Sequence, residues 1–357
     1  MNNQINVLVV DDSAAARMHL VHLLEVDPHI RVINTVADGQ AALDFLQEHR
    51  PDVILMDVNM PGLDGFETTR RIMEMRPVPV IICSASTKPK DVATTFHMME
   101  AGAVAIVEKP VGREHADFES MAAELRQTVK LMSEVTVVKR WSRTRSTPPT
   151  APALPAGEVR PPPVQVKCIG IGASTGGPPV LQTILAGLPK DFPVPILVVQ
   201  HIAQGFLPGL TEWLTQTTGL RIHIAAYGII PLPGHVYFAP DDFHMGLGSG
   251  GRIFLSREQP EEYLRPTVAF LFRSLADVCG PRAVGVLLTG MGRDGAAELK
   301  LMRDKGAVTI AQNRESSIVH GMPGEAIVLG GATHILAAEY IAGALVTLVG
   351  SRIDKGI

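Results

Sequence analysis

Acidic, hydroxyl and ammonium side chains come directly after short apolar runs in the first third of the chain. The residues at these positions are Asp11, Asp12, Asp57, Ser84 and Lys109. Three carboxylates that meet would repel one another unless a hard divalent cation shared them, and Mg²⁺ prefers oxygen ligands. A hydroxyl and a lysine beside them could hold a phosphoryl group. We therefore expect a site for Mg²⁺ and phosphate, whose metal ligands are Asp11, Asp12, Asp57 and the backbone carbonyl of Asn59.

A second set of reactive residues lies in three glycine-containing motifs further along the chain. Ser174 lies in GIGASTGGPP, His201 in VVQHIAQGF and Asp294 in LLTGMGRDGA. A serine on a strand-to-helix turn can be an exposed nucleophile, with nearby N–H groups directed at a developing oxyanion. Histidine can accept the hydroxyl proton if a carboxylate fixes its tautomer. These three residues predict acyl transfer by a serine hydrolase.

The elements that must position both sets alternate between short β-rich runs and helix-like stretches. In the first part the runs are INVLVV, RVINTVA, DVILMD, VPVIIC and AVAIVE, and in the second part they are KCIGIGAS, PILVVQH, AVGVLLTGM and AVTIAQN. This alternation predicts two α/β domains, each a doubly wound parallel sheet. Functional groups then gather beyond the carboxyl ends of the strands. HVYFAP and RIFLS, joined by GLGSGGR, predict an antiparallel hairpin inserted into or beside the second sheet.

A proline-rich stretch, RSTPPTAPALPAGEVRPPP, separates the two patterns. Its composition is typical of a semi-extended linker. We expect one domain over residues 1–132, a linker over 133–165 and a second domain over 166–357.

Composition limits the classes of function. The chain has 357 residues, of which 46% are hydrophobic, and a net charge of −4. This balance favours a globular protein without a nucleic-acid partner. No apolar run approaches the roughly 20 residues of a membrane span, and the first run is too short for a signal-peptide core. We expect a cytoplasmic protein with no direct membrane insertion.

Other interpretations of the glycine-rich motif are less well supported. Gly170, Gly172 and Gly176 are spaced as GxGxxxG, and no acidic residue closes the following strand as a dinucleotide fingerprint requires. A P-loop is excluded because Gly-Lys-Ser/Thr does not occur. Taken alone, Ser174 could be a helix cap, His201 a satisfied polar residue and Asp294 a turn residue.

The first domain resembles the response-regulator receiver family over residues 4–130, on the strand-end residues, DVNMPGLDG and Lys109–Pro110. The resemblance implies a flavodoxin-like fold and a cis peptide at Lys109–Pro110. It implies that Asp57 takes a phosphoryl group from a histidine kinase, here a chemotaxis kinase, while Ser84 and Lys109 contact that group. Mg²⁺ would be the cofactor.

The three later motifs, with GHVYFAPDDFHM, RPTV and SSIVHGMP, resemble the chemotaxis protein-glutamate methylesterase family. The resemblance implies a Rossmann-like domain in which Ser174 is the nucleophile, His201 the base and Asp294 the orienting acid. The backbone amide of Met291 would contribute to the oxyanion hole. Such enzymes need no cofactor for the ester reaction. They hydrolyse γ-glutamyl methyl esters on chemoreceptor signalling helices, releasing methanol, and some deamidate receptor glutamines. Their unphosphorylated receiver covers the active site.

The sequence departs from the family at three places: Ala203, Ala269 and Asn313–Arg314. We expect these residues to change the rim of the active-site cleft. A phosphorylation-dependent binding protein without turnover is an alternative, which the complete Ser, His and Asp set argues against. A transcription regulator is a further alternative, but no basic helix-turn-helix pattern follows the linker.

Overall fold

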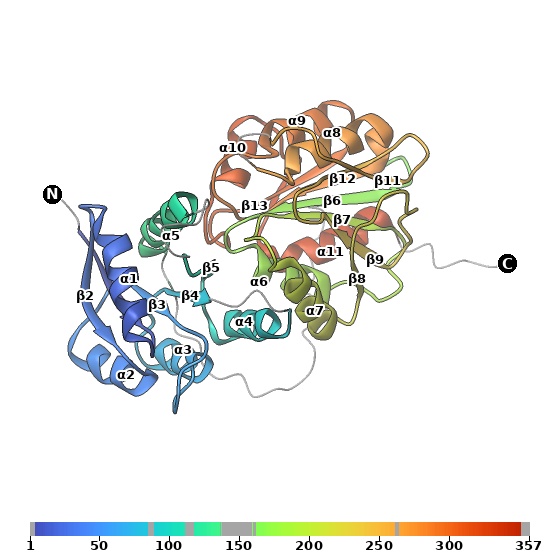
Figure 1. Ribbon diagram of the computed structural model, residues 1–357. Helices are drawn as coiled ribbons and strands as arrows, with labels where there is room; N and C mark the ends of the chain where they lie inside the picture. Colours follow the sequence, from blue (N-terminus) through green and yellow to red (C-terminus); the bar gives the residue numbers. More distant parts are fainter. Residues whose placement is uncertain are drawn as a thin grey trace. The chain divides into compact units, whose positions relative to one another are not determined.

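The structure of the protein is a computed structural model that describes residues 4–84, 89–110, 118–135, 137, 159, 162–260 and 264–350. The chain forms two compact units, Met1–Ser146 and Thr147–Ile357. Each unit holds one parallel sheet with helices on both faces (Figure 1). Most of the expected linker, 133–165, lies outside the described residues, so its bounds stay a prediction.

The first unit is a five-stranded parallel sheet in the order β2-β1-β3-β4-β5. This is the flavodoxin-like order, which confirms the expected fold class. Helices α1 and α5 pack together on one face, and α2, α3 and α4 on the other. The strands are β1 (Ile5–Val10), β2 (Ile30–Val36), β3 (Val53–Met56), β4 (Val80–Ser84) and β5 (Ala105–Glu108). The helices are α1 (Ala14–Glu25), α2 (Gly39–Glu48), α3 (Gly65–Met75), α4 (Pro89–Ala101) and α5 (Phe118–Ser133).

Strand register brings the acidic residues of this unit together. Val10 on β1 pairs with Met56 on β3, so Asp11 and Asp57 follow on adjacent strands. Ser84 on β4 pairs with Glu108 on β5, which places Lys109 one residue beyond. β3 is buried over its whole length, as expected for a strand covered on both faces. The polar residues therefore meet at the carboxyl edge of the sheet.

The second unit is a seven-stranded parallel sheet in the order β14-β13-β12-β6-β7-β9-β8. Helices α8, α9 and α10 cover one face, and α6, α7 and α11 cover the other (Figure 1). The strands are β6 (Cys168–Ala173), β7 (Ile196–Gln200), β8 (Arg221–Ile224), β9 (His235–Phe238), β12 (Ala283–Leu287), β13 (Val308–Gln312) and β14 (His334–Leu336). The helices are α6 (Gly177–Ala186), α7 (Leu207–Thr218), α8 (Val268–Val278), α9 (Ala296–Asp304), α10 (Met322–Val328) and α11 (Ala338–Val349), with a 3₁₀ turn, η1 (Gly280–Arg282).

Register in this sheet places Ser174 between two other strand ends. Ala173, the last residue of β6, pairs with Gln200, the last residue of β7, so Ser174 and His201 follow side by side. On the other side Gly172 pairs with Leu287 of β12, and two residues further Ser174 lies next to Thr289. Ser174 therefore lies in the middle of the sheet's carboxyl edge, between His201 and Thr289.

The expected hairpin is present, but its first strand is not HVYF. HVYF forms β9, which lies parallel in the main sheet between β7 and β8. The antiparallel pair is instead β10 (His244–Leu247) with β11 (Ile253–Ser256), joined by the glycine-rich turn. The physical reason is proximity, because Leu247 and Ile253 flank that turn directly and pair across it. β9 is fully inside the core apart from His235, as a central parallel strand should be.

Two further observations concern the backbone and the helices. Among the described residues the cis peptide is Arg265–Pro266, so the cis bond expected at Lys109–Pro110 is not observed. Of the helices that the structure describes, none has both the length and the apolar character needed to cross a bilayer.

Candidate active site and phosphoacceptor site

Three carboxylates and one lysine form a compact cluster at the carboxyl edge of the first sheet. One oxygen each of Asp11, Asp12 and Asp57 lies within 4.8 Å of the others. Lys109 Nζ lies 2.6 Å from Asp57 Oδ1 and 2.7 Å from Asp11 Oδ2. The cluster offers a cation three oxygen donors and offers an anion one ammonium group, which suits a hard divalent ion and a phosphoryl group together.

Burial and charge act differently on the members of this cluster. Asp57 is 8% exposed. Burial raises its pKa, and the neighbouring Asp11 adds to this, although Lys109 opposes both. Burial tends to lower the pKa of Lys109, but its pairing with two carboxylates outweighs burial and leaves that pKa raised. Lys109 therefore keeps its charge. Ionisation of Asp57 is unfavourable, because Lys109 offsets only part of the effect of burial.

The remaining residues expected at this site lie around Asp57. Ser84 ends β4 and is buried, and its carbonyl accepts a hydrogen bond from the Lys109 amide at 2.8 Å. Asn59 lies on the loop after β3, with an exposed side chain. Gly65 begins α3, and a Cβ there would lie 2.3 Å from the Asp57 carbonyl oxygen. The last glycine of DVNMPGLDG is therefore required by the close approach of α3 to the Asp57 carbonyl.

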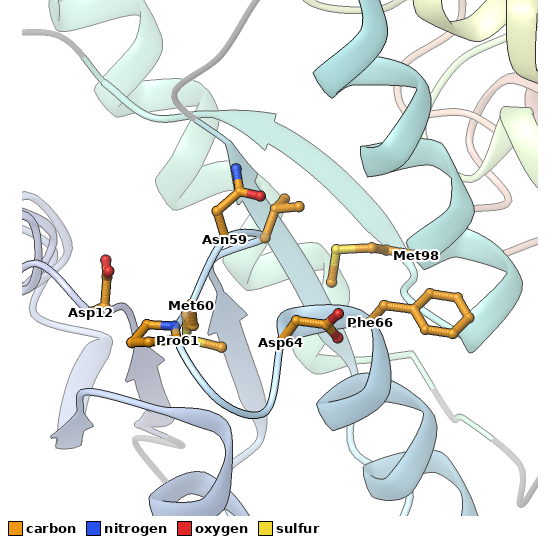
Figure 2. Close-up of a pocket in the computed structure, with 8 residues that line it drawn as sticks. Asp12, Asn59, Met60, Pro61, Asp64, Phe66 and Met98 are labelled. Carbon is orange, nitrogen blue, oxygen red and sulfur yellow. The ribbon is translucent and has the colours of Figure 1, made fainter.

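A depression of about 480 Å³ opens beside this loop. Figure 2 shows Asp12 on one side of it and Phe66 and Met98 on the other, with Asn59 and Pro61 on the loop between them. Phe66 is 37% exposed, so the depression has a partly apolar wall. The depression therefore adjoins the acidic cluster at Asp12.

In the second unit, Ser174 occupies a sharp turn between β6 and α6. Its amide donates to the Thr289 carbonyl at 3.0 Å, and its own carbonyl accepts from the Gly177 amide at 2.8 Å. The residue that caps α6 is Gly176, in a left-handed conformation with φ of 77°, and no side chain caps this helix. Ser174 is therefore not a helix cap. Its hydroxyl forms no hydrogen bond to any residue in the described part of the chain.

The side chains of His201 and Asp294 lie in close contact next to this turn. His201 Nε2 lies 3.0 Å from Asp294 Oδ2, and both side chains are largely buried. The usual triad places the carboxylate on Nδ1, whereas here it faces Nε2. Nδ1 is consequently the ring nitrogen left to accept a proton from a serine. Hydrogen bonds between a nucleophile and its base often tighten only when substrate is bound.

Asp294 also anchors a neighbouring helix. Its Oδ2 accepts from the Val268 amide at 2.7 Å and its Oδ1 from the Ala269 amide at 3.0 Å, so it holds the first turn of α8. Burial alone would raise its pKa, but His201 and the two amides outweigh burial and lower it. The carboxylate therefore stays ionised, which is the form that orients an imidazole.

The loop that carries Met291 lies against Ser174. A Cβ on Gly290 would lie 2.6 Å from Ser174 Cβ, so glycine is required for the two loops to touch. The Met291 side chain is 44% exposed. The carbonyl of Gly290 accepts hydrogen bonds from the Gly321 and Met322 amides, and these two bonds hold the loop in place.

The glycines of GxGxxxG serve packing between strand and helix. A Cβ on Gly170 would lie 2.4 Å from Leu275 Cδ1, and one on Gly172 would lie 2.3 Å from Val268 Cγ1, both on α8. Gly170 and Gly172 therefore allow α8 to pack closely against β6, and this packing explains both glycines without a bound dinucleotide.

The three departures from the family pattern lie in different settings. Ala269 is 7% exposed, its amide binds Asp294, and it lines a depression of about 400 Å³ with Arg293, Glu298 and Leu329. Asn313 is half-buried, and its side chain accepts from the Ser316 amide. Ala203 lies on the loop after His201, partly exposed. Ala269 thus belongs to the wall beside Asp294 and not to an exposed rim.

Sequence reasoning missed three buried polar residues at the carboxyl edge of this sheet. They are Gln200, Thr289 and Gln312, which are 5%, 0% and 0% exposed. Their signal in the sequence is a polar residue at the end of each apolar run, within VVQH, LLTG and IAQN.

Together the two folds and sites define a response-regulator receiver joined to an α/β domain of the serine-hydrolase class. The model of the CheB methylesterase family matches residues 169–345, and that of the response regulator receiver domain matches residues 7–117. A Nitrosospira multiformis protein named protein-glutamate methylesterase/protein-glutamine glutaminase is 51% identical over 351 residues, covering 98% of both chains. A Geobacter metallireducens relative of the same type is 51% identical over 345 residues, covering 96% of this chain and 99% of its own. The chain belongs to the CheB methylesterase family.

Solved structures are similar to each unit. The Thermotoga maritima CheB methylesterase catalytic domain is 39% identical, with a TM-score of 0.49, and covers 51% of this chain and 98% of its own. The response regulator domain of Thermotoga maritima CheB is 37% identical, with a TM-score of 0.34, and covers 37% of this chain and 98% of its own.

Proposed function

We propose that this protein is a phosphorylation-activated protein-glutamate methylesterase that hydrolyses γ-glutamyl methyl esters on chemoreceptor signalling helices. The observation that carries the proposal is the position of Ser174 between His201, paired with Asp294, and the glycine loop that bears Met291. The same site would deamidate receptor glutamines, because both reactions transfer a side-chain acyl group to water.

The ester reaction uses the chain's own groups. Ser174 Oγ attacks the glutamyl carbonyl carbon while His201 Nδ1 takes the hydroxyl proton. The Met291 amide stabilises the oxyanion of the tetrahedral intermediate, and His201 returns the proton to the departing methoxide as methanol. Water then attacks the acyl-enzyme by the same route and releases glutamate. Asp294 stabilises the imidazolium that forms in each step.

The receiver reaction uses the acidic cluster. An Asp57 oxygen attacks the phosphorus of a phosphohistidine on a chemotaxis histidine kinase; the P–N bond breaks, the kinase histidine leaves, and an acyl phosphate remains on Asp57. Lys109 and the Ser84 hydroxyl contact the phosphoryl oxygens. Asp11, Asp12, Asp57 and the backbone carbonyl of Asn59 would hold Mg²⁺. When bound, this ion neutralises charge on the carboxylates and the phosphoryl group.

The test measures methanol release from methylated receptor membranes, with and without a small phosphodonor, by the wild type, Ser174→Ala and Asp57→Asn. We expect the phosphodonor to stimulate the wild type, Ser174→Ala to be inactive, and Asp57→Asn to keep only the unstimulated rate. Activity in Ser174→Ala would show that the nucleophile is assigned wrongly. Failure of a fluorophosphonate probe to label Ser174 would favour a binding protein without turnover.

A further inference from the structure

Three polar side chains are buried directly behind the nucleophile and have no part in the reaction described so far. Gln200 is the last residue of β7, and Gln312 is the last residue of β13. Thr289 lies on the loop after β12. A buried polar group is costly unless hydrogen bonds satisfy it. The bonds of these residues therefore indicate what they hold in place.

Gln200 joins the nucleophile loop to the base loop. Its Nε2 donates to the Ser174 carbonyl at 2.9 Å and to the His201 carbonyl at 2.7 Å. One amide group has two hydrogens, so each carbonyl receives one of them. The opposite orientation would place an oxygen against two carbonyl oxygens, and the two acceptors thus determine how the amide points. A Cβ on Gly177 would lie 2.2 Å from Gln200 Oε1, so the glycine at the start of α6 leaves room for this side chain.

Thr289 holds the other side of the nucleophile. Its carbonyl accepts from the Ser174 amide at 3.0 Å. Its hydroxyl lies 3.0 Å from the Thr175 carbonyl and 3.1 Å from the Val319 carbonyl, and it accepts from the Val319 amide at 2.9 Å. The hydroxyl therefore ties the residue after the nucleophile to the segment that supports Gly290.

Gln312 completes this chain of hydrogen bonds from the next strand. Its Oε1 accepts from the Thr289 amide at 2.8 Å, and its Nε2 donates to the Ser316 carbonyl at 2.8 Å. Thr289 is therefore fixed at its amide, its carbonyl and its hydroxyl. The network runs from the loop after β7 to the loop after β13.

Given the proposed role of Ser174 as the nucleophile, we propose that Gln200 and Thr289 are positioning residues, which set the direction of Ser174 through hydrogen bonds to its main chain and to Thr175. Neither side chain needs to touch substrate. Loss of either leaves a main-chain group of the nucleophile turn without its partner, so Ser174 samples directions that are unproductive for attack. Such a loss lowers kcat and the reactivity of Ser174 more than it changes KM.

The test compares Thr289→Val and Gln200→Met with wild type in the full chain under a saturating small phosphodonor. The measurements are kcat and KM for methanol release from methylated receptor membranes, and the rate of fluorophosphonate labelling of Ser174. We expect kcat and labelling to fall by more than fivefold in both variants while KM changes by less than twofold. Thr289→Ser keeps the hydroxyl and should stay within fivefold of wild type.

Thr309→Val is the matched control for loss of a buried threonine hydroxyl. Thr309 lies on β13 in the same sheet and is fully buried, and its hydroxyl donates to the Gly331 carbonyl at 2.6 Å, close to the amino end of β14. It should lose stability, as Thr289→Val does, but keep kcat within twofold of wild type. If kcat of Thr289→Val and Gln200→Met stays within fivefold of this control, the positioning role is wrong. If one of the two does not fold, the other decides by the same threshold.

Ser174→Ala in the same assay separates this inference from the proposed function. Hydrolysis at the wild-type rate in Ser174→Ala would overturn the assignment of the nucleophile and, with it, the positioning role. An inactive Ser174→Ala beside nearly normal Thr289→Val and Gln200→Met would overturn the positioning role alone.

Discussion

Exchange of Asp294 for asparagine should disturb two sets of contacts that one carboxylate makes. Asp294 faces His201 Nε2 at 3.0 Å and accepts the Val268 and Ala269 amides at the start of α8. Asparagine keeps one acceptor oxygen but loses the charge and the second acceptor. We expect Asp294→Asn to reduce both the activity and the stability of the catalytic unit.

The magnitude follows from the contacts that are lost. A hydrogen bond to a charged group contributes about 1.5–3 kcal/mol, and a charge at a helix N-terminus contributes about 0.3–1 kcal/mol. The unfolding free energy should therefore fall by roughly 2–4 kcal/mol. An amide in place of the carboxylate of a serine-protease triad lowers kcat by about 10⁴, because it selects the wrong imidazole tautomer. We expect a loss in kcat of about that size here.

Urea unfolding gives the stability, and methanol release gives kcat. Trp213 on α7 is buried and reports the catalytic unit, provided that Trp141, the other tryptophan, is replaced by phenylalanine. Thr267→Ala is the matched control, because the Thr267 hydroxyl caps α8 through the Phe270 amide and its other partner is the His244 ring. It should cost about 0.5–2 kcal/mol and leave kcat unchanged. Equal kcat in wild type and Asp294→Asn would refute the orienting role.

The same variant has a defined dependence on pH. The pKa of Asp294 is lowered from 3.8 in the folded protein. Its contribution to stability is then complete above the unfolded value of 3.8 and is lost as the pH falls through the folded value. The difference in unfolding free energy between wild type and Asp294→Asn should be constant from pH 7 to about pH 5 and shrink below about pH 4. A difference that grows on acidification would contradict the lowered pKa.

Three further predictions concern other parts of the chain. Asp57→Asn should stabilise the receiver at pH 7 and do so less at pH 4, because burial raises the pKa of the Asp57 carboxyl and its ionisation then costs stability as the pH rises. Urea unfolding at the two pH values checks this, and a destabilised variant would contradict it. Gly172→Ala should lower the unfolding free energy by about 1–3 kcal/mol and lower kcat, because the new Cβ would lie 2.3 Å from Val268. An unchanged midpoint of thermal or urea unfolding would show that α8 can move aside. Removal of residues 1–140 should raise the unstimulated rate of methanol release if the receiver shields the site, and a folded but inactive fragment would exclude simple inhibition.

The sequence predicts the cluster of acidic residues and Lys109 well, because strand register follows from the pattern of apolar runs. Each reactive residue comes directly after an apolar run, and parallel strands bring such ends to one edge. Ser174, His201 and Asp294 are brought near one another by the same logic. Their catalytic roles stay predictions until the variants are measured.

The hairpin and the buried network could not be predicted in the same way. HVYF and HMGL are both short apolar runs near a glycine-rich turn, and only the neighbouring strands decide which of them joins the main sheet. Gln200 and Thr289 resemble ordinary polar residues at strand ends in sequence. Their hydrogen bonds join loops that are separated along the chain, by 26 residues between Gln200 and Ser174 and by 114 residues between Thr289 and Thr175.

The carboxyl and amino edges of the second sheet also differ in how well they should tolerate new chain ends or inserted domains. Ser174, His201 and the loop of Asp294 all follow the carboxyl ends of strands, whereas turns such as Gly219–Leu220 and Lys305–Gly306 connect helices to the amino ends. Circular permutation and domain insertion succeed best at turns that carry no buried bonds of a site. New chain ends, or an inserted reporter domain, at Gly219–Leu220 would leave the catalytic edge continuous. The amino edge is therefore the side from which this enzyme can be rebuilt as a biosensor.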